Sequence, residues 1–256
     1  MNNFLALVQN ENMKIYRRVR TWIMFGLLVL LTILFGVLFS LDGGSQRMSA
    51  WDALDQLSFL YYLVSIYAAV IAADIVAGEF TWGTIKLLLI RPWTRTKVLL
   101  SKLLAVLLFT LAMSAVFFVI ALAVSFLIFS NEPSQYLGDS PLSRILESLL
   151  YSYVDLLVIA AFSFMLSTVF RSSGIAIGLS IFILFAGNIF TLLFHPSRYA
   201  WAKYLLFTNM DLGQYRGGQV GPAGMTLGFS ITVLAVYVLL FLAVAWLVFK
   251  KRDVAA

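Results

Sequence analysis

Six long apolar runs, separated by short polar stretches, constrain the fold of this chain more than any other feature. A helix needs about 20 mostly apolar residues to cross the hydrocarbon core of a bilayer, and each run is of that length. A soluble fold of 256 residues, 62% of them hydrophobic and 12% charged, could not bury this much apolar surface. We therefore expect one all-α transmembrane domain over residues 1–256, with spans at 22–41, 57–76, 98–129, 145–170, 175–194 and 229–249.

The placement of charged residues predicts the orientation. Lys and Arg concentrate in the segments that share a side with the N-terminus, whereas Asp and Glu concentrate in the segments on the other side. By the positive-inside rule the N-terminus is cytoplasmic, and six spans return the C-terminus to the same side. The net charge of +6 thus reflects residues that flank the spans, and we expect no nucleic-acid partner.

The residue inventory excludes several kinds of chemistry. The chain has no cysteine and a single histidine, His195. Disulfides, thiolate catalysis and cysteine-ligated metals are therefore excluded, and a histidine metal site has almost no ligands to draw on. We expect no metal site in this chain.

The segment at residues 2–20 has the pattern of an amphipathic helix before the first span. Phe4, Leu5 and Val8 share one face with Ile15, Tyr16 and Val19, while Asn3, Glu11, Lys14 and the arginines that follow lie opposite. We expect this helix to lie in the cytoplasmic interface, with its basic end at the lipid headgroups. The alternative is an ordinary basic flank that only fixes orientation.

The inner loop between the second and third spans carries the densest mixture of charged, apolar and turn residues. Its run at 84–90 is too short to span, and Thr84 can cap a short helix that Pro92 ends. The leucines in this run are more apolar than an exposed loop requires, which fits docking to a partner protein. Packing beneath the bundle explains them equally well, so both interpretations stay open.

The same loop contains an imitation of a phosphate-binding loop. Gly78 and Gly83 have the required spacing, but Thr84 and Ile85 occupy the positions where that motif needs Lys followed by Ser or Thr. The motif does not occur elsewhere in the chain. If ATP drives this protein, a different chain must hydrolyse it, and the chain itself is not expected to be an enzyme.

The loop pattern A-G-E-x-x-x-G-T-[IL]-K-x-L-L-x-R-P-x-[ST]-R resembles the permease subunits of type-2 ATP-binding-cassette (ABC) exporters. The segments Lys203–Asn209 and Phe249–Asp253 also look like that family, and the resemblance covers the whole chain. The matching loop residues are Ala77, Gly78, Glu79, Gly83, Thr84, Ile85, Lys86, Leu88, Leu89, Arg91, Pro92, Thr94, Arg95, Leu99, Ser101 and Lys102.

The resemblance implies a coupling helix in this loop, which sits in a groove of a cytoplasmic ATPase subunit. ATP and Mg²⁺ would be bound by that partner, and no cofactor by this chain. It also implies a second permease chain, identical or similar, and a bacterial plasma membrane. The cargo would be a small molecule, peptide or antibiotic. The residues predicted to act in coupling are Glu79, Gly83, Thr84, Leu88, Arg91, Pro92 and Arg95.

A few polar and small residues inside the spans are further candidates. Asp155 and Asn188 are predicted for the transport path or, for Asn188, for helix–helix hydrogen bonding. Asp74 lies near the inner end of its span, where pairing with a Lys or Arg gives it a structural role. Gly174 and Gly178 could permit close helix packing.

Two other functions remain as alternatives. The first is an ion-coupled carrier that works alone, although the two halves of the chain show no repeat. The second is an intramembrane enzyme in which Asp74 and Asp155 share a proton and activate water. That second function requires the two carboxylates to approach each other.

Overall fold

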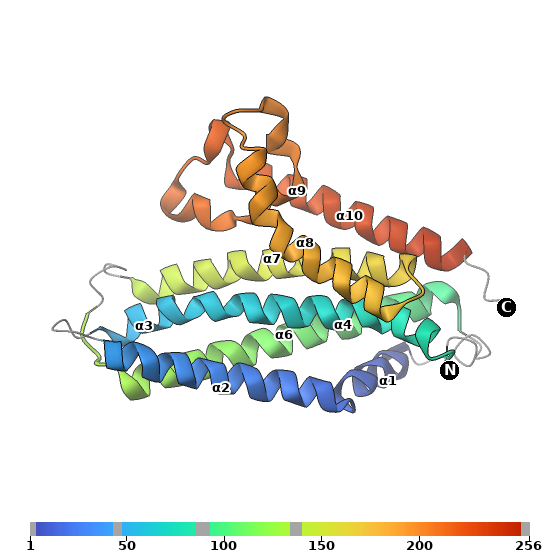
Figure 1. Ribbon diagram of the computed structural model, residues 1–256, viewed down its shortest axis with the longest axis horizontal. Coiled ribbons are helices and arrows are strands. Elements are labelled where there is room, and N and C mark those ends of the chain that lie inside the picture. The colour runs from blue at the N-terminus through green and yellow to red at the C-terminus, as the bar shows by residue number, and fades with distance from the viewer. Residues whose placement is uncertain (1–3, 43–47, 85–92, 134–139, 252–256) are drawn as a thin grey trace.

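The computed structural model describes residues 4–42, 48–84, 93–133 and 140–251, and helices make up nearly all of them, with no strand. Figure 1 shows the long helices side by side along the longest axis of the molecule. The helices are α1 (Phe4–Tyr16), α2 (Val19–Asp42), α3 (Ala50–Leu57), η1 (Ser58–Leu60), α4 (Tyr61–Thr81), α6 (Arg95–Ile128), α7 (Pro141–Val169), α8 (Ser173–Leu193), η2 (Ala200–Tyr204), α9 (Leu206–Met210), η3 (Leu212–Gly218), η4 (Pro222–Gly224) and α10 (Leu227–Lys251).

Six helical segments in the described residues are long and apolar enough to cross a membrane, which confirms the predicted number. Five of them begin and end within four residues of the predicted bounds. The second is longer than predicted, because α3, η1 and α4 form one stretch from Ala50 to Thr81. Ser49 caps its start by accepting the backbone N–H of Asp52 at 3.1 Å. At its other end the charged Glu79 is ion-paired, so the helix continues past residue 76.

Helix α4 is the centre of the bundle. Of the most apolar 18 residues in the span that contains α4, 67% are buried. The corresponding share is 17% for the spans of α2 and α10. It packs mainly on α7, α8 and α6. Small residues let these helices approach closely, as is usual between membrane helices. The small buried residues of α4 are Ala68, Ala69, Ala72, Ala73, Ala77 and Gly78.

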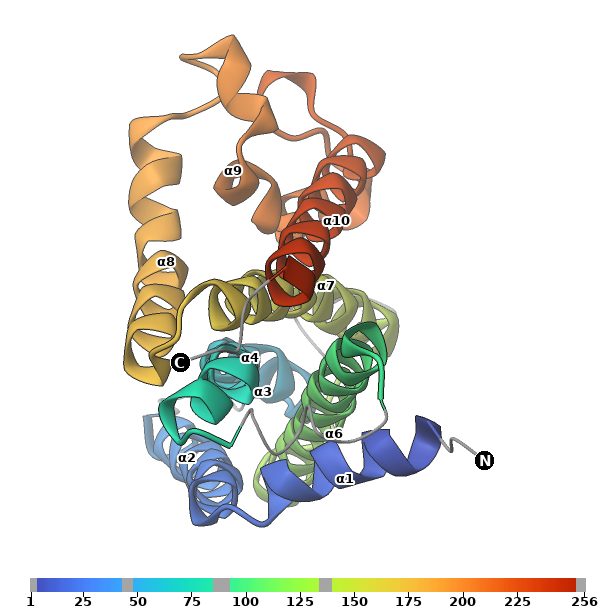
Figure 2. The same ribbon diagram turned by 90° about the vertical axis from the view of Figure 1, so that its right-hand side faces the viewer.

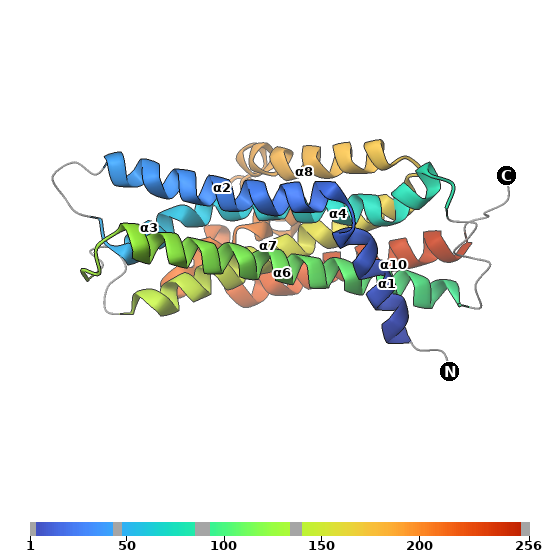
Figure 3. The same cartoon turned by 90° about the horizontal axis from the view of Figure 1, so that it is seen from below.

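The chain bends sharply between α1 and α2, and two side chains of α2 stabilise the bend. Thr21 Oγ1 donates to the carbonyl of Ile15 at 2.6 Å, and Trp22 Nε1 donates to that of Tyr16 at 2.8 Å. Ile15 and Tyr16 are the last residues of α1, and their carbonyls have no hydrogen-bond partner within that helix. The predicted helix at 2–20 is therefore two helices, and α1 crosses the end of the bundle against α6 (Figures 2 and 3).

The prediction that Glu11 lies on the polar face of α1 is wrong. The side chains that α1 buries are those of Leu7, Val8, Glu11 and Ile15, of which Val8 and Ile15 belong to the predicted apolar face. Leu5, which also belongs to the predicted apolar face, is 75% exposed. The reason is that Glu11, counted with the solvated side, has ion-pair partners inside the protein and turns the helix toward them.

One end of the bundle, which we call the α1 end, gathers five segments of the chain (Figure 1). They are α1, the last turn of α4, the start of α6, the connection of α7 to α8, and the last turn of α10. Arg95 donates from Nη1 to the carbonyl of Lys250 at 3.1 Å, and Thr81 donates from Oγ1 to that of Arg171 at 3.3 Å. The two terminal helices thus end on the same side of the bundle.

The segment between α8 and α10 folds into short helices packed between those two (Figure 2). Asn209 of α9 is fully buried and holds this segment together. Its Nδ2 donates to the carbonyls of Lys203 and Leu205 at 2.8 and 2.7 Å, and its Oδ1 accepts from Ser230 Oγ of α10 at 2.7 Å. A polar residue is thus buried with its hydrogen bonds made, which avoids the cost of desolvating it alone.

The predicted close packing at Gly174 and Gly178 does not occur within this chain. A Cβ at Gly178 would meet nothing within 4 Å, and one at Gly174 would meet only Ser172 Oγ at 3.9 Å. Close approach occurs elsewhere: Gly36 of α2 lies against the side chain of Val124, and a Cβ at Gly187 of α8 would meet the ring of Phe207 at 3.0 Å.

Candidate functional site

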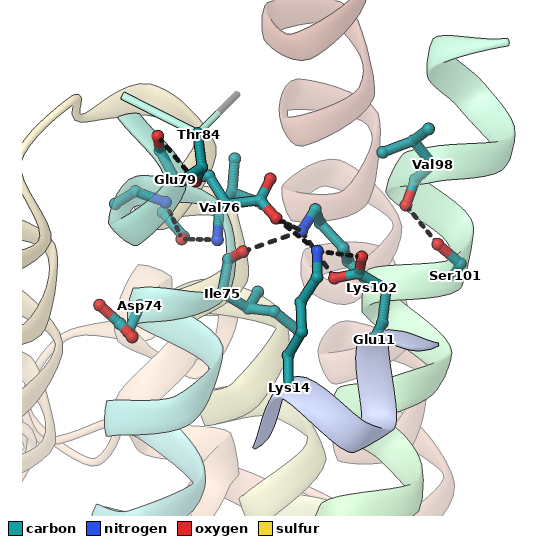
Figure 4. Close-up of polar contacts among 12 residues, drawn as sticks. Glu11, Lys14, Asp74, Ile75, Val76, Glu79, Thr84, Val98, Ser101 and Lys102 are labelled. Atoms are coloured by element: carbon teal, nitrogen blue, oxygen red, sulfur yellow. Dashed lines mark hydrogen bonds and ion pairs between the residues drawn. The ribbon is translucent and has the colours of Figure 1, made fainter. Parts of the chain in front are cut away.

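Four charged side chains form a closed ring at the α1 end, which we call the charge ring (Figure 4). Lys102 Nζ of α6 lies 2.7 Å from Glu11 Oε2 of α1 and 2.7 Å from Glu79 Oε1 of α4. Lys14 Nζ of α1 lies 2.5 Å from Glu11 Oε1 and 2.8 Å from Glu79 Oε1. Each carboxylate therefore faces two ammonium groups, and the ring has no net charge.

Most of the charge ring is removed from solvent. Lys102 is 0% exposed, Glu11 1% and Glu79 8%. Lys102 also donates to the carbonyl of Ile75 at 3.2 Å, which satisfies a further proton of its ammonium group. Removing one charged side chain from a buried ion-pair cluster leaves its partner buried without a counter-charge, which lowers the free energy of unfolding by about 3–5 kcal/mol. The ring therefore fixes α1, α4 and α6 relative to one another.

The pKa values of the α1 members reflect the ring. Burial opposes the ionisation of Glu11, but the ammonium groups of Lys102 and Lys14 outweigh it and hold the pKa of this carboxyl below its ordinary value. Burial also disfavours the charged form of Lys14, yet Glu79 and Glu11 raise the pKa of this lysine above its ordinary value. Both residues are thus held in their charged forms.

A second cluster lies beside the ring and centres on Asp74 of α4. Its carboxylate accepts from the guanidinium groups of Arg18 and Arg20, at the start of α2, and from the hydroxyl of Ser173, at the start of α8. The predicted pairing of Asp74 with basic residues near the end of its helix is confirmed. The cluster connects α2 and α8 to α4, as the ring connects α1 and α6 to it.

An open cavity of about 860 Å³ lies between the two clusters. Arginine and lysine side chains of α1 and α2 form one wall, and the last turn of α4 forms the other. The residues that line it are Asn10, Lys14, Arg17, Arg18, Arg20, Asp74, Gly78, Glu79, Thr81, Trp82, Thr84 and Ser173.

The structure describes four of the seven predicted coupling residues, namely Glu79, Gly83, Thr84 and Arg95. Glu79 belongs to the charge ring, and Thr84 donates from Oγ1 to its carbonyl at 3.5 Å. Gly83 has a φ of 67°, a conformation that glycine adopts at little cost and that ends α4. Arg95 begins α6 and contacts α10. Leu88, Arg91 and Pro92 lie outside the described residues, as does the run at 85–90 predicted to be helical.

Asp155 lies in a different place, at the middle of α7. It lines a cavity of about 820 Å³ among α4, α7, α8 and the segment before α10, which we call the Asp155 cavity. Its Oδ1 is buried and has no hydrogen-bond partner among the described residues. Asn188 is on α8, but its side chain lies outside the described part of the structure.

The structure does not bring Asp74 and Asp155 together. Beyond Asp155, α7 continues to Val169, which is about 21 Å of helix at 1.5 Å per residue. Ser173, which bonds Asp74, lies past that end. The geometric basis for an enzyme that uses this pair is therefore absent. The described residues also contain no group of three or more His, Cys, Asp or Glu placed to hold a metal ion.

Three members of the charge ring, Glu11, Lys14 and Lys102, were not predicted as site residues. A signal was present in the sequence for two of them, Glu11 and Lys102. Lys102 interrupts an otherwise apolar span, and Glu11 stands four residues from both Leu7 and Ile15, so all three share a helix face. A charge at either position calls for a partner of opposite sign.

The six span-length helices, their apolar surfaces and the buried ion pairs at one end define a multi-pass helical membrane protein. The chain belongs to the family DUF2705, described as a protein of unknown function, which it matches over residues 20–255. It is 32% identical to the uncharacterized protein YhcI of Bacillus subtilis, over 98% of this chain and 99% of that one. It is 33% identical to the uncharacterized membrane protein YdbK of the same organism, over 76% of this chain and 79% of the relative.

The first prediction concerns the buried lysine of the ring. Replacing Lys102 with Met leaves Glu11 and Glu79 with only one ammonium group between them, and the Glu11 carboxylate is itself buried. We expect the free energy of unfolding to fall by about 3–5 kcal/mol, measured by denaturation in mild detergent. Lys97→Met, an exposed change on the same helix, should alter it by less than about 0.5 kcal/mol.

The double variant Lys102→Met, Glu11→Gln identifies the cause of that loss. Removing the uncompensated carboxylate should recover part of the lost stability, because the glutamine amide is not ionised. If Lys102→Met were as stable as Lys97→Met, the charge ring would not hold these helices together.

The second prediction concerns pH. Because the folded-state pKa of Glu11 is lower than its ordinary value of 4.5, its ionisation stabilises the fold above that pH. This contribution should disappear as the pH falls below about 4.5, through the folded-state pKa. Thermal unfolding of the wild type and of Glu11→Gln between pH 3 and 7 should show the two curves converge on the acid side. Curves that stay parallel across this range would contradict the assignment.

Proposed function

We propose that this chain is the membrane-spanning permease subunit of an ATP-driven exporter in a bacterial plasma membrane. A separate cytoplasmic ATPase subunit would bind ATP and Mg²⁺, and two permease chains, identical or similar, would assemble with it. In this proposal the α1 end is cytoplasmic, so that both termini are inside. The resemblance of the loop at 77–102 to type-2 ABC permeases motivates the proposal.

The observation that carries the proposal is the position of the charge ring. Helix α4 ends at Thr81, two residues after Glu79, and α6 begins at Arg95, seven residues before Lys102. Both residues belong to the ring, and the ring also includes α1. A force applied to this connection by a docked protein therefore acts at once on three helices that are fixed to one another.

The packing of the bundle supports an assembly of two chains. Helix α4 fills the centre and is closely packed against α6, α7 and α8, so a single chain leaves little room for a path along its axis. A transport path would then lie between two chains. Gly174 and Gly178, at the exposed start of α8, have no close neighbours within this chain and leave room for a second helix.

A stand-alone ion-coupled carrier is the second candidate function. The observation that favours it is the buried Asp155 oxygen without a hydrogen-bond partner, since carboxylates inside membrane helices often take part in proton or ion movement. The two functions differ in their energy source. Transport by a carrier would need an ion gradient and no ATPase partner.

The third prediction concerns orientation. The chain has no cysteine, so single cysteines report on one position each. Thr84 follows α4 at the α1 end, and Gln219 follows η3; both are exposed. In intact cells a membrane-impermeant maleimide should label Gln219→Cys at once, and Thr84→Cys only after the cells are opened. The reverse pattern would place the α1 end outside and overturn the proposed docking of a cytoplasmic ATPase.

The fourth prediction concerns the ATPase partner. The tagged chain, purified in mild detergent from its native cell, should carry an equimolar protein that contains a phosphate-binding loop and hydrolyses ATP. Arg91→Ala, in the inner loop, should weaken this association about tenfold or more, as expected for a charged contact at an interface.

Arg198→Ala is the matched control for that experiment, because Arg198 is exposed in the segment before α10, away from the α1 end. It removes the same charge and should leave the association unchanged. If no ATPase accompanies the chain under any mild condition, the exporter proposal is wrong and the ion-coupled carrier takes its place.

A further inference from the structure

The Asp155 cavity has the size and position of a small-molecule site. Its volume of about 820 Å³ falls within the range of about 300–1,000 Å³ that is common for ligand pockets. Helices α4, α7 and α8 supply three walls, and the segment around α9 covers it. It is separate from the charge ring and from the cavity beside Asp74, with which it shares no lining residue.

The lining combines aromatic and aliphatic side chains with negative charge. Tyr62 of α4, Phe162 of α7 and Phe207 of α9 present rings to the cavity, and Asp155 and Asp211 supply two carboxylates. No Lys or Arg is among the described residues that line it. The described part of the chain also offers neither carboxylate an ion-pair partner.

The only histidine of the chain, His195, also lines the cavity. Its Nδ1 accepts a hydrogen bond from the backbone N–H of Ser197 at 3.3 Å. Arg216 of the covering segment donates to the hydroxyl of Ser148, which does not line the cavity. Among the described residues, neither carboxylate of the cavity is therefore paired with a Lys or Arg side chain.

A carboxylate in this position is costly until a cation arrives. Asp155 stands in the span α7, its Oδ1 is buried, and it makes no hydrogen bond within the described residues. Asp211 lines the same cavity, and like charges repel. Buried charges in membrane helices are normally paired, so the missing partner is expected to come from outside the chain.

We infer that the Asp155 cavity binds an organic monocation with a bulky apolar body. The carboxylates select the positive charge, while the aromatic rings bury the apolar groups and can also face the cation directly. A bare divalent metal ion fits poorly, because the described residues hold no group of three or more His, Cys, Asp or Glu placed to bind one.

This inference rests on the proposed function and extends it, since the bound cation would be the class of cargo that the exporter moves. The site lies on the far side of the bundle from the charge ring. Energy from the α4–α6 connection would thus reach it through α4, which lines the cavity with Tyr61, Tyr62 and Ser65 and contributes Glu79 to the ring.

The test uses three probes of the same shape. Tetraphenylphosphonium is a bulky monocation, tetraphenylborate is its anionic counterpart, and tetraphenylsilane is neutral. The full-length chain is placed in nanodiscs of phosphatidylcholine, and binding of each probe is measured by equilibrium dialysis against empty nanodiscs. We expect the cation to bind at least tenfold more tightly than the anion, after the empty-disc signal is subtracted.

Variants of the carboxylates locate the binding. Asp155→Asn should weaken binding of the phosphonium about tenfold or more, and Asp155→Glu, which keeps the charge, should retain most of it. Glu147→Gln is the matched control: it removes one negative charge from the same helix, at a residue that bonds Tyr151 and does not line the cavity. It should bind the probe as the wild type does. Thermal unfolding of each variant confirms that it is folded.

Two results would overturn the inference: equal binding of cation and anion by the wild type, or full phosphonium binding by both Asp155→Asn and Asp211→Asn. If Asp155→Asn does not fold, Asp211→Asn decides, and its unchanged affinity would count against the site. The assay needs no ATPase. A chain that binds the cation but recruits no ATPase would support the ligand site and refute the exporter proposal. A chain that recruits an ATPase but does not bind the cation would support the exporter proposal and refute the ligand site.

Discussion

A ring of four charges, three of them buried, holds this protein together at one end. Glu11, Lys14, Glu79 and Lys102 come from three helices that are far apart in sequence, and each carboxylate faces two ammonium groups. Apolar packing between helices in a membrane is weakly directional, because lipid tails are as apolar as side chains. The ring supplies the specificity that such packing lacks, and it fixes α1 in one register against α4 and α6.

The charge ring and the Asp155 cavity represent two opposite solutions for buried charge. In the ring every carboxylate meets a cation from the same chain, and the result is a rigid junction. In the cavity Asp155 has no such partner, which leaves room for a ligand. Both lie along α4, whose small residues allow neighbouring helices to pack closely around it. Helix α4 thus links the chain segment between α4 and α6 to the proposed ligand site.

The sequence predicted the helical spans well because length and hydropathy depend on local composition. It also predicted that Asp74 would pair with basic residues at an inner helix end. It could not predict the ring, because Glu11 and Lys102 lie 91 positions apart and their pairing depends on how three helices pack. The same limit explains the misassigned face of α1: a periodicity argument places every charge toward solvent, whereas Glu11 faces a buried lysine.

The ring also constrains how the protein is made. Glu11 leaves the ribosome 91 residues ahead of Lys102, a delay of roughly 5 to 20 s at ordinary rates of translation. During that time the Glu11 carboxylate lacks its buried ammonium partner, while α2, α3 and α4 are completed. The junction of α1, α4 and α6 can therefore close only after the start of α6 has been made, and α1 reaches its final place later than its position in the chain suggests.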